Sequence, residues 1–226
     1  MSDLMAITRP VITNRLVRHD IQASDPSILT DIVQEDTNIV IWQRSLTNSQ
    51  KQAADTLVVT HPMLELSVIV SPQDAYATIR NALGNTEAAV ILSEDIAALV
   101  DRFCGLFDLN GAILRLTALD RAMCPRFHVD HVPCRLITTY QGVATEWLPH
   151  HSADRTKLGT GNNGKPDELS GLYQYESDIQ QLHCGDVALL KGEIWPKNEG
   201  AGLIHRSPQL PHGLHRLLLT MDFISD

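Results

Sequence analysis

The residues best suited to chemistry in this 226-residue chain are two histidines and one aspartate in its C-terminal half. One residue separates His128 from Asp130, so on a β-strand their side chains would point to the same side. His205 supplies a second imidazole much later in the chain. Two imidazoles and one carboxylate form the ligand set of non-haem Fe(II) sites that keep open coordination positions. The pattern therefore predicts that His128, Asp130 and His205 bind one metal ion.

Arg216 follows His205 by eleven residues, within the apolar run 214–224. On a strand it shares a face with Leu218 and Thr220, where a guanidinium is costly to bury unless a carboxylate meets it. That carboxylate could belong to the protein or to a ligand. A fork-shaped cation near a metal is suited to grip the distal carboxylate of a chelating keto-acid.

Histidine is abundant around these residues, since eight of the ten histidines lie between His128 and His215. His131, His212 and His215 are therefore alternative ligands. A site richer in histidine is typical of Zn(II), which prefers tetrahedral nitrogen ligands and performs no redox chemistry. The four cysteines contain no Cys-x-x-Cys pair, so we expect free and mostly buried thiols rather than a zinc ribbon.

The charge balance argues against a nucleic-acid partner, because the formal net charge is −9 and the chain has no basic run. No apolar stretch reaches the roughly 18 residues needed to span a bilayer. Residues 1–5 lack the basic and apolar parts of a signal peptide. We therefore expect a cytoplasmic protein with no membrane partner. Its substrate would be a small molecule or a protein, and it could form a homodimer.

The elements that must position these residues change in type near residue 110. Before that point helices predominate, and residues 94–107 carry apolar side chains at three- and four-residue spacing behind Ser93, a candidate N-cap. Residues 152–170 are polar and glycine-rich, which predicts a loop long enough to be a lid or a disordered insertion. Strands are predicted after residue 110, the clearest at 112–119, 134–140, 187–190 and 214–224.

Helices followed by many short strands predict one α+β domain over residues 1–226. A mainly helical layer, residues 1–110, is expected to pack on a β-rich metal-binding core, residues 111–226. Short strands enclosing a His/Asp site favour a double-stranded β-helix of the cupin or jelly-roll type for that core. The final strand has apolar residues on both faces and is expected to be central.

Two blocks of the chain resemble a bacterial family, domain-of-unknown-function family 1826. The first begins at Phe127-His128-Val129-Asp130 and ends at Thr145-Glu146-Trp147-Leu148. The second runs from Gly185-Asp186 to Asp222 through Ile204-His205-Arg206-Ser207-Pro208. Trp42-Gln43-Arg44 resembles the family's N-terminal marker, so the resemblance covers most of the chain. Members are often associated with zinc-responsive gene sets, which implies a metal-related role.

The same residues resemble the wider 2-oxoglutarate/Fe(II) dioxygenase pattern. This resemblance implies that His128, Asp130 and His205 hold Fe(II) and that Arg216 binds the far carboxylate of 2-oxoglutarate. Tyr140 could add a hydrogen bond to the keto-acid, although a core position is the commoner role for such a residue. Two alternatives stay open: a non-catalytic zinc-binding or zinc-homeostasis protein with the same ligands, and a cupin-like protein that only mediates protein contacts.

Overall fold

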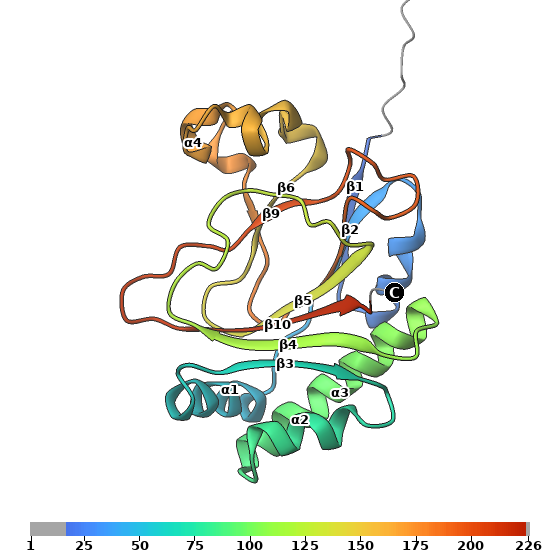
Figure 1. The fold of residues 1–226 in the computed structure, drawn as a ribbon, viewed down its shortest axis with the longest axis vertical. Coiled ribbons are helices and arrows are strands. Elements are labelled where there is room, and N and C mark those ends of the chain that lie inside the picture. Colours follow the sequence, from blue (N-terminus) through green and yellow to red (C-terminus); the bar gives the residue numbers. More distant parts are fainter. Residues whose placement is uncertain (1–16, 225–226) are drawn as a thin grey trace, which may run out of the picture.

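The computed structural model describes residues 17–224, so the expectation about residues 1–5 lies outside the described range. Its strands form two sheets, and in Figure 1 β6 and β9 of the small sheet lie above β5, β10, β4 and β3 of the large sheet. The large sheet has the strand order β1-β2-β8-β5-β10-β4-β3, and the small sheet has the order β7-β6-β9. The bounds are β1 His19–Ala23, β2 Thr37–Trp42, β3 Glu65–Val70, β4 Ala112–Leu119, β5 Cys134–Gln141, β6 Glu146–Leu148, β7 Gln180–Gln181, β8 Val187–Lys191, β9 Ile204–Arg206 and β10 Arg216–Phe223.

The last strand, β10, lies inside the large sheet between β5 and β4 and runs antiparallel to both. Its side chains alternate between two environments. Leu217 and Leu219 belong to the main hydrophobic core with the helices, whereas Leu218 and Thr220 line a pocket on the opposite face. Both faces are covered, as the apolar sequence of this strand predicts.

Three helices cover the outer face of the large sheet: α1 Asn48–Thr60, α2 Ala75–Leu83 and α3 Glu87–Phe107 (Figure 1). α3 begins earlier than the predicted residue 94, because its N-cap is Thr86 and not Ser93. The Thr86 hydroxyl accepts a hydrogen bond from the backbone N–H of Ala89, and Ser93 is buried within the helix. Its predicted apolar face, which includes Ile96 and Phe103, packs into the core.

The predicted division into an N-terminal helical layer and a C-terminal β-rich core is not confirmed. The first 110 residues also supply β1, β2 and β3, and β2 lies inside the large sheet. Its Ile39-Val40-Ile41 run is β-branched and buried on both faces. Val40 packs toward the helices, while Ile39 and Ile41 pack toward the small sheet. Both halves of the chain therefore build one sheet.

Residues 152–170 are ordered into short helical turns rather than a plain loop. They comprise the end of a turn at His150–Ser152, turns at Arg155–Lys157 and Gly159–Asn162, and the short helix α4 Asp167–Ser170. This segment lies beside the small sheet, away from helices α1 to α3 (Figure 1). Within residues 17–224, no helix combines the length and the hydropathy that crossing a bilayer requires.

Candidate metal centre

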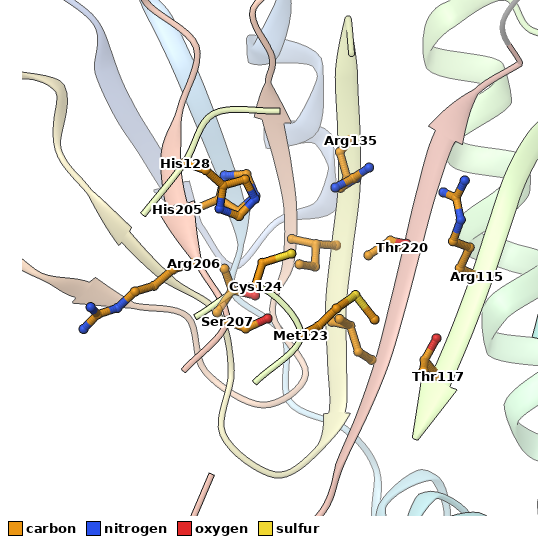
Figure 2. Close-up of a pocket in the computed structure, with 13 residues that line it drawn as sticks. Arg115, Thr117, Met123, Cys124, His128, Arg135, His205, Arg206, Ser207 and Thr220 are labelled. Carbon is orange, nitrogen blue, oxygen red and sulfur yellow. The ribbon is translucent and has the colours of Figure 1, made fainter. Parts of the chain in front are cut away.

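A pocket with a volume of about 230 Å³ lies between the large and the small sheet (Figure 2). His128 and His205 line one side, and Arg115, Arg135 and Thr220 of the large sheet face them from the other. No lining residue is acidic. The remaining lining residues are Thr117, Met123, Cys124, Ile137, Thr145, Arg206, Ser207 and Leu218.

The two histidines lie side by side because their backbones form an antiparallel bridge. The N–H of each residue donates to the carbonyl of the other at 3.0 Å. His205 lies in β9, whereas His128 lies in an irregular segment between β4 and β5. The predicted strand at His-x-Asp is therefore wrong. The isolated bridge to His205 fixes the position of His128 instead.

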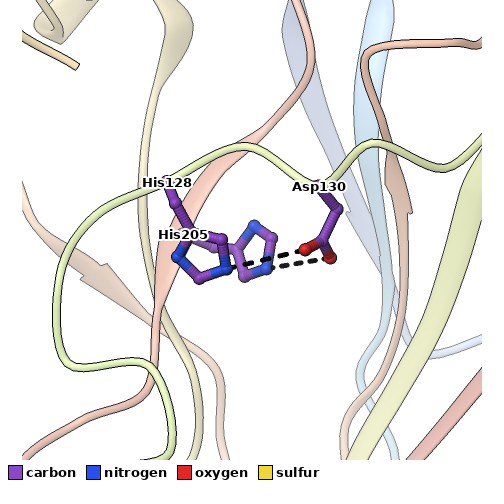
Figure 3. A group of neighbouring side chains, drawn as sticks. All are labelled: His128, Asp130 and His205. Atoms are coloured by element: carbon purple, nitrogen blue, oxygen red, sulfur yellow. Dashed lines mark ion pairs between the residues drawn. The ribbon is translucent and has the colours of Figure 1, made fainter. Parts of the chain in front are cut away.

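Asp130 faces both imidazoles (Figure 3). Nε2 of His128 lies 3.5 Å from one carboxylate oxygen, and Nε2 of His205 lies 3.3 Å from the other. One potential ligand atom from each residue lies within 4.8 Å of the other two. Adjacent ligand atoms at about 2 Å from one metal ion are separated by about 3 Å, so this group fits around a single ion after small adjustments. The structure thus brings together the three residues predicted from the sequence.

Backbone carbonyls orient both imidazole rings. Nδ1 of His128 lies 2.9 Å from the Arg126 carbonyl, and Nδ1 of His205 lies 3.2 Å from the Leu203 carbonyl. Because a carbonyl can only accept, each Nδ1 carries the hydrogen, and in the neutral ring the lone pair is on Nε2, toward Asp130. Metal-binding histidines are commonly oriented in this way.

The electrostatics of the group favour a cation between its ligand atoms. Burial opposes ionisation of Asp130, but hydrogen bonds from His128 and His205 and the charge of Arg135 hold its pKa well below the ordinary range. The hydrogen bond with Asp130 in turn raises the pKa of His128. The ionised Asp130 carboxylate therefore favours a positive charge beside it, either a proton on an imidazole or a metal ion.

Arg135 is a residue that the sequence analysis missed. Its Nη1 lies 2.5 Å from Asp130 Oδ2, and its Nε lies 2.8 Å from Asp222 Oδ1. Arg115 binds the same Asp222 carboxylate at 2.7 Å. Arg135 and Asp222 are cross-strand partners on β5 and β10. That pairing becomes visible only once the strand register is known.

Arg216 is 1% exposed and points to the pocket side of β10. Its Nη2 donates to Thr145 Oγ1 at 2.6 Å and to Thr139 Oγ1 at 3.1 Å. Among residues 17–224, no carboxylate forms an ion pair with it. Burial lowers the pKa of Arg216 to about 10, so it stays charged at neutral pH. Thr145 also lines the pocket, which places this uncompensated charge one side chain behind the pocket wall.

Tyr140 does not lie where a keto-acid contact requires it. It occupies the helix-facing side of β5, and its hydroxyl donates to Asp95 Oδ2 at 2.5 Å. Burial raises the pKa of Tyr140 well above its usual value, so the hydroxyl stays protonated. Alternation along β5 turns Ile137 and Thr139 toward the pocket side instead. The commoner role for Tyr140, a core position, matches its placement.

The alternative histidines His131, His212 and His215 do not join the metal-binding group found in the described part of the chain. All four cysteines are free thiols, as predicted, although only Cys104 and Cys134 are buried. Cys124 is exposed and lines the pocket near the histidines (Figure 2).

Comparison with known proteins gives a family and a fold. The family model described as "Protein of unknown function (DUF1826)" matches residues 23–222. No curated protein matches the sequence. Among solved structures, a dioxygenase for auxin oxidation from rice has a TM-score of 0.51 at 10% identity, covering 92% of this chain and 83% of that one.

Two further similar structures have lower TM-scores. The Arabidopsis thaliana dioxygenase for auxin oxidation 1, in a complex with 2-oxoglutarate, has a TM-score of 0.49 at 12% identity and covers 93% of both chains. A prolyl-4-hydroxylase from Pseudomonas putida has a TM-score of 0.45 at 11% identity, covering 88% of this chain and 98% of that one. The rice structure supports the predicted fold at the level of a mixed α/β chain with a large sheet. With the family model matching residues 23–222, the chain belongs to the DUF1826 family.

Proposed function

We propose that this protein is a mononuclear Fe(II)/2-oxoglutarate-type oxygenase. The observation that carries the proposal is the combination of a three-ligand group whose two histidines line the pocket and a buried, uncompensated arginine directly behind the pocket wall at Thr145. A His/Asp group alone suits several metals, and a buried arginine alone suits several anions. Together they match the two ends of a chelating keto-acid, which needs a metal for its keto-acid group and a cation for its distal carboxylate.

The donor set fits Fe(II) better than a structural zinc ion. A structural zinc site is closed by four protein ligands, whereas His128, Asp130 and His205 are joined by no fourth histidine or cysteine among the described residues. Three ligands gathered at one side leave coordination positions open for small molecules. The non-catalytic zinc alternative therefore has no support from this geometry.

Arg216 fits the distal carboxylate of 2-oxoglutarate. A buried guanidinium with only threonine hydroxyls as side-chain partners carries a desolvation cost that an anion would offset. Thr139 and Thr145 hold the fork in place, and their hydroxyl hydrogens remain available to an anionic oxygen. The carboxylate partner considered from the sequence is then a ligand rather than a side chain of the protein.

Bound Fe(II) and 2-oxoglutarate would supply, with O2 as the oxidant, the insertion of one oxygen atom into a substrate C–H bond, coupled to conversion of the keto-acid to succinate and CO2 by the other oxygen atom. The chain itself has three tasks. His128, Asp130 and His205 hold the metal, Arg216 neutralises and orients the keto-acid, and the apolar side chains of Ile137 and Leu218 help to exclude water from the pocket between them. The substrate, a small molecule or a protein, would enter this pocket.

The test is an anaerobic titration of 2-oxoglutarate into the Fe(II)-loaded protein, followed by the visible metal-to-ligand charge-transfer band. We expect a saturable band with one keto-acid per iron. Arg216→Ala should retain the metal and raise the Kd of 2-oxoglutarate about 10- to 100-fold, because a charge-assisted contact is worth about 1.5–3 kcal/mol. Arg121→Gln is the matched control, since Arg121 is exposed and pairs only weakly with Asp120.

His205→Ala tests the metal half of the proposal separately. It should remove most iron binding, measured as metal stoichiometry after gel filtration. Full iron occupancy in that variant would contradict the ligand assignment. Iron binding without any charge-transfer band, or equal keto-acid affinity in the wild type and Arg216→Ala, would contradict the keto-acid assignment.

A further inference from the structure

We propose that Asp167 is a positioning residue for the metal centre, acting from the helical-turn segment of residues 150–170, which we call the strap. This inference rests on the metal site of the proposed function but not on its keto-acid chemistry. Asp167 lies at the start of α4, is 7% exposed, and contacts a residue next to each of the two histidine ligands. Its carboxylate contacts Arg126, Phe127 and Arg206.

On the His128 side, Asp167 fixes the two residues that precede the ligand. Its Oδ2 accepts a hydrogen bond from the backbone N–H of Phe127 at 2.8 Å, and its Oδ1 accepts one from Arg126 Nε at 3.2 Å. The Arg126 carbonyl is the group that orients the imidazole of His128. Holding residues 126 and 127 therefore holds the direction of His128 Nε2.

On the His205 side, Asp167 acts through the next residue along β9. Arg206 Nη1 lies 3.3 Å from Asp167 Oδ2, and Arg206 Nε lies 2.6 Å from Glu146 Oε2. The Arg206 guanidinium points away from the two histidines (Figure 2) and lies 4.3 Å from the centre of the Phe127 ring. Phe127 and Arg206 thus stack on one another directly beside the bridge between His128 and His205.

The strap also forms a wall of the site. A second cavity of about 620 Å³ lies on another side of His128, and Arg155, Thr156, Leu158, Gly159 and Thr160 of the strap line it. One segment therefore shapes the space outside the metal ligands and, through Asp167, bonds to the residues adjacent to two of them. A carboxylate placed only for stability would not need to contact the neighbours of both histidines.

The experiment measures binding of Co(II) alone to the full-length protein, by titration and by the visible ligand-field spectrum. We expect Asp167→Ala to raise the Kd of Co(II) about 10- to 100-fold and to change the spectrum, as is typical when a partner that orients metal ligands is lost. Asp167→Asn keeps one oxygen that can accept the Phe127 N–H. Its Kd for Co(II) should therefore lie between that of the wild type and that of Asp167→Ala. Asp154→Asn is the matched control, because the side chain of this exposed strap aspartate bonds to Thr156 within its own turn. Its Kd for Co(II) should stay within twofold of the wild type.

Circular dichroism before each titration shows that the variant is folded, and Asp167→Asn carries the test if Asp167→Ala does not fold. Unchanged Co(II) affinity and an unchanged spectrum in the folded Asp167 variants would overturn this inference while leaving the proposed function intact. A wild-type protein that binds no Co(II) would overturn both. Absence of a keto-acid band with Asp167-dependent Co(II) binding would overturn the oxygenase proposal alone.

Discussion

A metal ion bound by the proposed triad would compete with a proton for the same position between its ligand atoms. The Asp130 carboxylate raises the pKa of His128, so the metal-free fold binds a proton there more tightly than the unfolded chain does. This proton stabilises the metal-free fold below the ordinary histidine pKa, and that contribution is lost as the pH rises through the raised pKa. A metal requires the neutral ring, so its contribution has the opposite pH dependence.

We therefore predict that metal-induced stabilisation increases with pH. The difference in Tm between Mn(II)-saturated and metal-free protein should be small at pH 5.5. It should reach about 5–10 °C at pH 8, the shift expected when the metal is at about 100 times its Kd. Thermal unfolding at both pH values measures it, with His205→Gln as a control in which the difference should vanish. A difference that is constant or falls with pH would contradict the assignment of His128 as a ligand.

Arg135 should support metal binding through its contact with Asp130. We predict that Arg135→Gln raises the Kd of Co(II) about tenfold, because Asp130 loses the guanidinium that fixes its orientation. Arg115→Gln is the control, since Arg115 shares the Asp222 carboxylate but does not contact Asp130. Calorimetric titration of both variants measures the effect. Equal affinities in the two variants would show that the Arg135–Asp130 contact does not support the metal.

Residue types and spacing predicted the triad and Arg216 because each has a chemical preference visible without its neighbours. Arg135 and Asp167 could not be found in this way. Their roles depend on partners that only strand register and the path of the strap bring close. Tyr140 shows the reverse case: its position near His-x-Asp in the sequence suggests a keto-acid contact beside the commoner core role, and β-strand alternation turns it toward the helices.

At the scale of elements, the junction after β8 holds the segment that carries Asp130. Backbone N–H groups of Gly192 and Glu193 donate to the carbonyls of Pro133 and Asp130, both at 2.9 Å. A Cβ atom on Gly192 would lie 2.0 Å from the Val132 carbonyl oxygen and 2.8 Å from that of Asp130. Only glycine permits this approach without moving the segment.

We predict that Gly192→Ala displaces Asp130, lowers the free energy of unfolding by about 1–3 kcal/mol and weakens Co(II) binding. Gly105→Ala provides the control, because Gly105 lies in α3 with nothing within 4 Å of its added Cβ. That helical change should be neutral or stabilise by about 0.5–1 kcal/mol. Chemical denaturation measures the free energy of unfolding of both variants, and titration measures their Kd for Co(II). A Gly192→Ala variant with the Co(II) affinity of the wild type would contradict the predicted displacement of Asp130.

Strand predictions were accurate where apolar and β-branched runs were long, as at β4, β5 and β10. The strand expected at His-x-Asp fails because Pro125 and Pro133 flank it, and proline removes a ladder donor and restricts the residue before it. β2 lies within a half that the sequence pattern predicts to be mainly helical, although its Ile-Val-Ile run is typical of a buried strand. Which strands join which sheet depends on contacts between distant segments, and local pattern does not show it.

At the scale of the whole molecule, the large sheet separates two polar networks of different purpose. On its pocket face lie the triad and Arg216. On its helix face, Arg44 forms an ion pair with Asp95 at 2.8 Å, and Asp95 also accepts the Tyr140 hydroxyl hydrogen. Asp95 is in α3 and Tyr140 in β5, so this second network joins a helix to the sheet. Two adjacent residues of β5 thus belong to different networks: Thr139 bonds to Arg216 on the pocket face, and Tyr140 bonds to Asp95 on the helix face.

Removing the hydroxyl of Tyr140 should therefore separate stability from ligand binding. We predict that Tyr140→Phe lowers the free energy of unfolding by about 1–3 kcal/mol, because a hydrogen bond to a charged group is lost and Asp95 keeps its remaining partners. The Kd of 2-oxoglutarate in the Fe(II)-loaded protein should stay within twofold of the wild type. Thr139→Val, one residue away on the pocket face, should weaken keto-acid binding because Arg216 loses a hydroxyl partner. A Tyr140→Phe variant with impaired keto-acid affinity and normal stability would mean that the two faces of the sheet are not independent. Tyr140 would then count among the residues that support keto-acid binding.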